Sequence, residues 1–186
     1  MSNLSNKSNS NGGYRNLVAY QLAVVIFDLN DLFVKSYIDP RSRTKDQMEQ
    51  AARSGKQNIV EASLLRSLEG NIKLTGVARG SFGELLEDYE DFLRTRGLKL
   101  WGKDDPRVLE IRRIRVSSNK SNLSNWTNSP ESFCNLMITL LHLENYLLDQ
   151  LLRKLEEKFV NEGGFRENLF RRRLERKFGN GLTARK

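Results

Sequence analysis

The segment 42–62 carries a row of small and apolar residues at the spacing of one helix face. This spacing predicts an amphipathic helix, because residues three or four positions apart share a side of an α-helix. Thr44 and Gln47 have the spacing of a capping box, and the helix is expected over about 43–66. The small side chains would let a neighbouring helix approach closely. The row consists of Met48, Ala51, Ala52, Gly55, Ile59 and Ala62.

Three further segments repeat apolar residues with the same period, at 15–37, 72–96 and 129–163, and a shorter basic one follows at 165–178. No segment alternates apolar and polar residues in the way that a strand does. We therefore predict an all-α fold, namely an antiparallel four-helix bundle with an additional short basic C-terminal helix. The face expected to be buried in the first helix is Val18, Leu22, Val25, Leu29 and Leu32.

Two tracts rich in Ser and Asn, one at the N-terminus and one inside the chain, offer almost nothing to bury. They predict a disordered polar tail over 1–13 and a polar insert at about 117–128 within a bundle domain that spans 14–178. A flexible basic tail is expected over 179–186. The pattern within 98–128 fits either a short helix or an extended segment.

The net charge of +8 is unevenly distributed. Residues 165–186 contain eight Lys or Arg against two Glu, and residues 103–120 contain six basic against three acidic side chains. The leucine-rich segment 131–162 has the opposite balance, with six acidic and three basic side chains. Such local basic clusters favour an anionic partner, which could be nucleic acid, an acidic protein or an anionic membrane.

Three features of the sequence favour the cytoplasm. The chain has one cysteine, Cys134, so it cannot form an internal disulfide. The N-terminal residues lack the apolar stretch of a signal peptide. The longest apolar run, 17–29, is too short to span a bilayer and contains Gln21 and Asp28. We expect a cytoplasmic protein.

Residues that could carry catalysis are few. His142 is the one histidine and has no evident partner, and Cys134 reads more naturally as a small apolar filler. The carboxylates of 84–91 read as a solvated helix face, since no Glu-x-x-His motif accompanies them. The three glycines of 76–83 have the spacing of a helix that packs closely rather than of a phosphate loop. We expect no enzyme, no metal and no cofactor; an unrecognised site around His142 or the carboxylates is the remaining alternative.

Clustered arginines give better support for nucleic-acid binding, because the guanidinium fork suits phosphate. No helix-turn-helix or aromatic sheet motif is present, so we expect recognition of shape and charge rather than of sequence. Glu167 and Glu175 interrupt the polar face of the last helix, which argues against a membrane-bound helix. The candidate nucleic-acid-binding residues are Arg112, Arg113, Arg115, Arg166, Arg171, Arg172, Arg173, Arg176 and Lys177.

The segments 50–62 and 80–85 resemble the signatures of a family of bacterial four-helix bundle proteins. That family includes products of intervening sequences in large-subunit ribosomal RNA genes and the accessory variability protein of diversity-generating retroelements. The resemblance is closer still to the subgroup called four-helix bundle suffix domains, whose patterns are matched at 42–48, 88–94 and 163–165. The structural family-motif residues are Arg53, Asn58, Glu61, Gly80, Ser81 and Glu84.

The resemblance implies a homo-oligomer, a pentamer in the wider family, with no catalytic residues. It also implies an accessory protein that binds RNA and a reverse transcriptase. From residues and resemblance together we expect a non-enzymatic oligomer that binds nucleic acid, structured RNA rather than DNA, beside a reverse transcriptase or other nucleic-acid enzyme. The alternative is a protein-interaction scaffold that docks a genetically linked enzyme without touching nucleic acid.

Overall fold

A computed structural model describes residues 13–114 and 120–178, and every regular element in these ranges is helical. The prediction of an all-α protein is therefore confirmed for the described residues. The tails predicted at both ends, apart from Gly13, lie outside them. The elements are η1 (Gly13–Asn16), α1 (Val18–Tyr37), α2 (Arg43–Leu64), α3 (Leu68–Thr95), α4 (Pro106–Arg113), η2 (Lys120–Trp126), α5 (Pro130–Glu162) and α6 (Phe165–Phe178).

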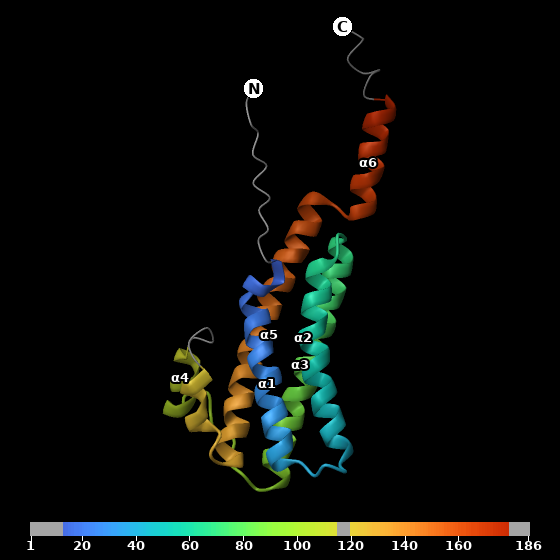
Figure 1. Cartoon of the computed structure of the whole chain (residues 1–186). Coiled ribbons are helices and arrows are strands. Elements are labelled where there is room, and N and C mark those ends of the chain that lie inside the picture. Colours follow the sequence, from blue (N-terminus) through green and yellow to red (C-terminus); the bar gives the residue numbers. More distant parts are fainter. Residues whose placement is uncertain (1–12, 115–119, 179–186) are drawn as a thin grey trace, which may run out of the picture.

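Four long helices lie side by side and form a helical bundle (Figure 1). α2 packs against α3, α3 against α5, and α1 against both α2 and α5. The short helix α4 lies beside the end of the bundle where α5 begins, whereas α6 projects beyond the opposite end. None of the described helices combines the length and the hydropathy needed to cross a membrane.

The row of small residues on α2 faces the core, and all six of its members are buried. Gly55 allows the closest approach: a Cβ atom at this position would lie 2.6 Å from the ring of Phe82 on α3. The glycines at 76, 80 and 83 do not have the predicted role in close packing. A Cβ atom at Gly76 or Gly80 would meet nothing within 4 Å, so the glycine that brings α2 and α3 together is Gly55.

Two local predictions for the first two helices are wrong. α2 begins at Arg43 as expected, but its cap is Ser42 rather than Thr44: the Ser42 hydroxyl accepts a hydrogen bond from the Thr44 backbone N–H at 3.2 Å. On α1, Leu22 and Val25 are buried as predicted, but Val18 is 59% and Leu32 48% exposed. α1 is apolar over a wide arc, so its period could not indicate which part of the arc turns inward. The buried face is Ala19, Leu22, Ala23, Val25, Ile26, Asn30, Phe33 and Val34.

An aromatic cluster closes the core near the α4 end. The ring of Phe33 lies 4.9 to 5.3 Å from the rings of Tyr37, Tyr89, Phe92 and Phe133, which come from α1, α3 and α5. The Tyr89 hydroxyl donates to the Asn30 amide oxygen at 3.0 Å. The Asn30 amide nitrogen in turn donates to the carbonyl of residue 48 at 3.2 Å, so these buried polar side chains are satisfied and link three helices.

The region that the sequence left open contains the helix α4, which Asp105 caps and Pro106 begins. The polar insert also differs from the expectation of a tract without packed structure. Its residues 120–126 form η2, and Leu123 is buried in the core. One leucine and Trp126, whose ring lies 5.9 Å from that of Trp101, are enough to hold this segment against the bundle.

Candidate nucleic-acid interface

The direction of α6 is set at the two glycines that separate it from α5. Gly163 has a φ of 74°, a left-handed conformation that glycine adopts without strain. The Glu167 carboxylate accepts a hydrogen bond from the Gly164 N–H at 2.9 Å, and the Asn168 amide donates to the carbonyls of residues 162 and 163. α6 therefore begins as a well-capped helix that turns away from the axis of α5 (Figure 1).

One polar contact ties the start of α6 to the bundle. Glu69, in the first turn of α3, has a lowered pKa because its carboxylate accepts a hydrogen bond from Ser67 and, to a smaller degree, from the Phe165 backbone N–H. Arg166 contributes a favourable charge to the same carboxylate. No residue of α6 is buried, and the side chains that face the bundle come from its first half, where Phe165, Leu169 and Arg172 line a cavity beside the α2–α3 turn.

The basic side chains predicted on the last helix are all exposed to solvent. Among the described residues, none of them forms an ion pair with a carboxylate within 4.0 Å. The ammonium of Lys177 does lie 5.4 Å from the centre of the Phe178 ring. Anions in solution can therefore reach these charges without displacing a carboxylate partner. The side chains are Arg166, Arg171, Arg172, Arg173, Arg176 and Lys177.

The arginines predicted near residue 113 have a different setting. Arg112 donates to the carbonyl of Lys103 at 3.4 Å, and Arg113 is exposed at the end of α4. Arg115 lies outside the described residues. The most engaged arginine here is Arg107, which the sequence did not single out. Its guanidinium bonds Asp105 at 2.8 Å and lies 3.7 Å from the centre of the Trp101 ring.

The contact with Arg107 lowers the pKa of Asp105. The side-chain and backbone hydrogen bonds from Arg107 lower the pKa of the carboxyl to about 2. Since Asp105 is also the cap of α4, the arginine holds the start of the helix and covers Trp101. Arg107 is thus part of the structure of this end of the bundle, and a charge run in a sequence does not distinguish such an arginine from an available one.

The two basic clusters lie at opposite ends of the molecule (Figure 1). α5 separates them, and its 33 residues at 1.5 Å per residue make a rod of about 50 Å. The structure therefore does not bring Arg112 and Arg113 together with the arginines of α6 on one surface of a single chain. Of the two clusters, α6 carries more charge and fewer internal contacts.

The residues of the family motif are likewise spread out. The Ser81 hydroxyl donates to the Ser54 hydroxyl at 3.0 Å, which links α3 to α2. The amide of Asn58 donates to the carbonyl of Ser54 within its own helix, at 2.8 Å, rather than between helices. The other motif side chains, together with the glycine, lie at exposed positions and converge on no site: Arg53, Glu61, Gly80 and Glu84.

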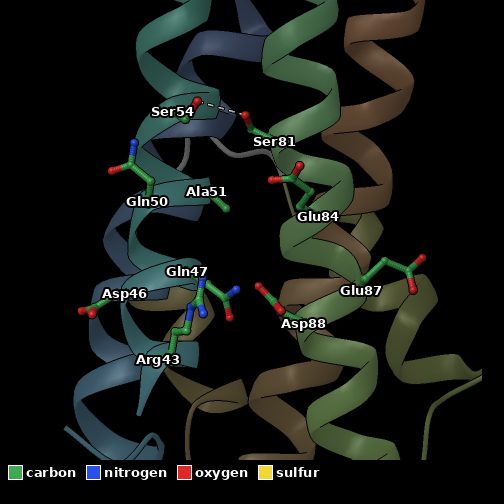
Figure 2. A pocket seen from close by; sticks show the side chains of 10 residues that line it. All are labelled: Arg43, Asp46, Gln47, Gln50, Ala51, Ser54, Ser81, Glu84, Glu87 and Asp88. Atoms are coloured by element: carbon green, nitrogen blue, oxygen red, sulfur yellow. Dashed lines mark hydrogen bonds between the residues drawn. The ribbon is translucent and has the colours of Figure 1, made fainter. Parts of the chain in front are cut away.

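A groove of about 850 Å³ runs between α2 and α3 below the Ser54–Ser81 hydrogen bond (Figure 2). Asp88 points across it toward α2, and Glu84 lies one turn above. Burial, followed by the neighbouring carboxylates of Asp91 and Glu84, raises the pKa of Asp88. The described lining residues are Arg43, Asp46, Gln47, Gln50, Ala51, Ser54, Ser81, Glu84, Glu87 and Asp88.

The residues considered for catalysis do not come together. His142 is exposed on α5, and Cys134 is a buried free thiol whose pKa is raised by burial. That direction is opposite to the one that a nucleophilic cysteine requires. No group of three or more His, Cys, Asp or Glu side chains within residues 13–114 and 120–178 has the geometry to hold a metal ion.

Glu144 is an unusual titratable group whose burial was not predicted from the sequence. Its side chain is 0% exposed, and neither carboxyl oxygen has a hydrogen-bond partner among the described residues. Burial is the sole cause that raises its pKa well above the ordinary value of a glutamate. Its burial could have been predicted from its position, because Glu144 lies on the same face of the helix as the buried Met137, Leu140 and Leu148.

Comparison of the chain with protein-family models, with curated proteins and with solved structures finds no match. The resemblance to the suffix-domain subgroup therefore stays a prediction from short motifs.

Proposed function

We propose that this chain is a non-enzymatic nucleic-acid-binding protein that contacts structured RNA through the basic side chains of α6. The observation that carries the proposal is the set of exposed cations that form no ion pair with a carboxylate of the described residues, on a helix that projects from the bundle. Each phosphate that such a cation neutralises releases condensed counterions, which favours binding without regard to sequence. In this proposal the four long helices are an antiparallel four-helix bundle that serves as a rigid support for α6.

The exposed arginines of α4 form a second and weaker contact in this proposal. Arg112 and Arg113 lie about 50 Å from α6 along α5, so a short RNA hairpin cannot reach both clusters of one chain. Only a homo-oligomer in which neighbouring chains run antiparallel or are staggered would bring α4 of one copy near α6 of another; the homo-oligomer, a pentamer by the family resemblance, is part of the proposal. Service as a cytoplasmic accessory to a reverse transcriptase or another nucleic-acid enzyme belongs to the same proposal.

The test replaces the central arginines of α6: Arg171→Ala, Arg172→Ala and Arg173→Ala in one variant. Affinity for an RNA hairpin should fall by at least about tenfold at low salt, and equally for unrelated hairpin sequences. Fluorescence anisotropy measures this on nuclease-treated protein. The matched control removes three exposed cations that are ion-paired in the bundle, Lys35, Arg94 and Lys158, and should change affinity far less. Equal losses in the two variants would contradict a role specific to α6.

A protein-interaction scaffold is the second candidate, and one observation favours it. Phe170, Leu174 and Phe178 are exposed on the same helix, which is more apolar surface than phosphate contact requires. A complex with a genetically linked enzyme that survives nuclease treatment in a pull-down would support the scaffold. Loss of the complex on nuclease treatment would support nucleic-acid binding.

A further inference from the structure

α6 has an apolar row that nothing in the described chain covers. Phe170 is 61% and Phe178 54% exposed, and Leu174 lies between them at helical spacing. At 100° per residue, Arg171 and Lys177 lie about 60° to either side of Leu174 on the helix surface. A helix with an apolar row between two flanking cations suits a groove with a small-residue floor and acidic walls.

The groove between α2 and α3 has this composition. Ala51, Ser54 and Ser81 are its small residues, so a helix can approach its floor closely. Glu84 and Asp88 face it from α3, while Arg43 is the one cation among its described lining residues (Figure 2). From Arg43 to Ser54 the groove extends about 17 Å along α2, against about 21 Å for the 14 residues of α6.

The α6 of the same chain cannot fill this groove. Phe165, its first residue, lines a cavity with Leu65 and Leu68, where α2 has ended and α3 begins. Ser54 lies at the end of the groove that is nearer to α6. It precedes Leu64, the last residue of α2, by ten residues, or about 15 Å along the helix. Folded back on its Gly163–Gly164 hinge, α6 would cover that stretch of α2 and reach only the rim of the groove.

We propose that α6 of one copy docks into the α2–α3 groove of a second copy, with Leu174 on the small-residue floor. Charge complementarity selects this occupant: Arg171 and Lys177 then face the carboxylates of the groove, Glu84 and Asp88 among them. The raised pKa of Asp88 fits a carboxylate that lacks a cation in the isolated chain, and a docked cation would lower it.

This contact goes beyond the proposed function and does not depend on it. With Leu174 turned into the groove, Arg172 and Arg176 lie on the opposite side of α6, where RNA can still reach them. The contact joins two different surfaces, so repetition closes a ring or extends an open chain. One surface of each copy is thereby used for assembly and another is left for an anionic ligand.

Charge reversal tests the contact in the full-length chain. The groove variant carries Glu84→Lys and Asp88→Lys, and the helix variant carries Arg171→Glu and Lys177→Glu. Sedimentation velocity on nuclease-treated protein at about 50 mM and about 500 mM salt gives the mass of each. We expect the wild type to assemble at low salt and to dissociate at high salt. Each variant alone should dissociate, with a self-association constant at least about tenfold weaker.

Mixing the two variants is the decisive step. The unaltered basic helix of the groove variant complements the unaltered groove of the helix variant, and the two reversed surfaces complement each other, so the mixture should assemble again. Circular dichroism checks folding, and Glu84→Gln with Asp88→Asn replaces the groove variant if the lysines prevent folding. A monomeric wild type, a groove variant that assembles like the wild type, or a mixture that does not assemble would each overturn the proposal. RNA binding by the groove variant reports separately on the proposed function, because that variant keeps every cation of α6.

Discussion

The two basic ends of this molecule are built differently. At the α4 end, Arg107 bonds Asp105 and stacks on Trp101, and the backbone N–H of Trp101 donates to the amide oxygen of Asn135 on α5 at 2.7 Å. At the α6 end, the arginines have no carboxylate partner among the described residues, and the aromatic side chains beside them are exposed. Arginines and aromatic residues therefore stabilise the fold at the α4 end, whereas at the α6 end they are exposed and can contact a ligand.

A basic cluster is available to a ligand only where its cations are not already paired within the chain. The sequence shows clustered basic residues at both ends. Whether these side chains can bind a ligand depends on whether carboxylates and aromatic rings of the same chain already contact them. A surface ion pair adds little stability, yet it occupies the arginine that an RNA phosphate would need. The α6 end is therefore the better candidate for a ligand, and the α4 end for a structural role.

The two ends should differ strongly in how much they contribute to the free energy of unfolding. Trp101→Ala should lower the free energy of unfolding by about 3–5 kcal/mol, because Trp101 is buried and its indole N–H bonds Glu131. A chain that ends after Glu162 should lose less than about 1 kcal/mol, because no residue of α6 is buried. Urea unfolding followed by circular dichroism measures both. A truncation that costs as much as the tryptophan would show that α6 is part of the core.

A second prediction concerns a buried group between the two ends. Glu144 lies 11 residues farther along α5 than Phe133 and has no hydrogen-bond partner in the described part of the chain, whereas the buried Asn30 and Tyr89 near the α4 end bond each other. Its pKa is raised in the folded state, so the unfolded chain gives up this proton at a lower pH than the folded chain does. Stability should therefore be greatest below the ordinary glutamate pKa and fall as the pH rises above it, by up to about 1.4 kcal/mol per pH unit.

Glu144→Leu should remove that pH dependence and raise the free energy of unfolding at pH 7 by about 1–3 kcal/mol. Urea unfolding at several pH values from 5 to 8 measures it for wild type and variant. Glu61→Leu is the matched control, since solvent surrounds Glu61 on α2. A wild type whose stability does not change with pH relative to Glu144→Leu would mean that the carboxyl finds a partner in solution.

Two glycines of the α2–α3 pair differ in whether a methyl group would meet the neighbouring helix. Gly55→Ala should destabilise the fold by about 1–3 kcal/mol, because the new methyl group would overlap the ring of Phe82. Gly80→Ala should stabilise it by about 0.5–1 kcal/mol, because a methyl group there meets nothing within 4 Å and alanine favours the helix. Thermal melting compares the two variants. Shifts of the same sign would contradict the packing of α2 on α3 described above.

The sequence predicted most of the fold because helical periods are long and regular here. It identified the buried row of α2 completely, from Met48 to Ala62, and the bounds of α6 at Phe165 and Phe178. For α1 it identified Leu22 and Val25 but also included the exposed Val18 and Leu32, because apolar residues cover a wide arc of this helix and the spacing does not indicate which part of the arc is buried.

The candidate site was harder to predict than the fold. The arginines of α6 could be singled out by their density, but the partners of Arg107 and the isolation of Glu144 depend on which helices pack together. Likewise, the glycine that permits close packing is Gly55, because Phe82 of α3 lies over it, and spacing along one helix cannot report that contact. The sequence predicted features of a single helix, such as its bounds and its apolar face. It did not predict features that depend on which two helices are in contact.

The contact between α6 and nucleic acid can be measured through the salt dependence of RNA binding. An RNA hairpin is titrated with the nuclease-treated full chain, and with its Arg171→Ala, Arg172→Ala, Arg173→Ala variant, over a series of salt concentrations. For the wild type the logarithm of the binding constant should fall with the logarithm of salt at a slope between about −3 and −5, and the variant should lose about 2 to 3 of that slope. Absence of binding at low salt, or an identical slope for the two proteins, would contradict the claim that α6 is the contact with nucleic acid.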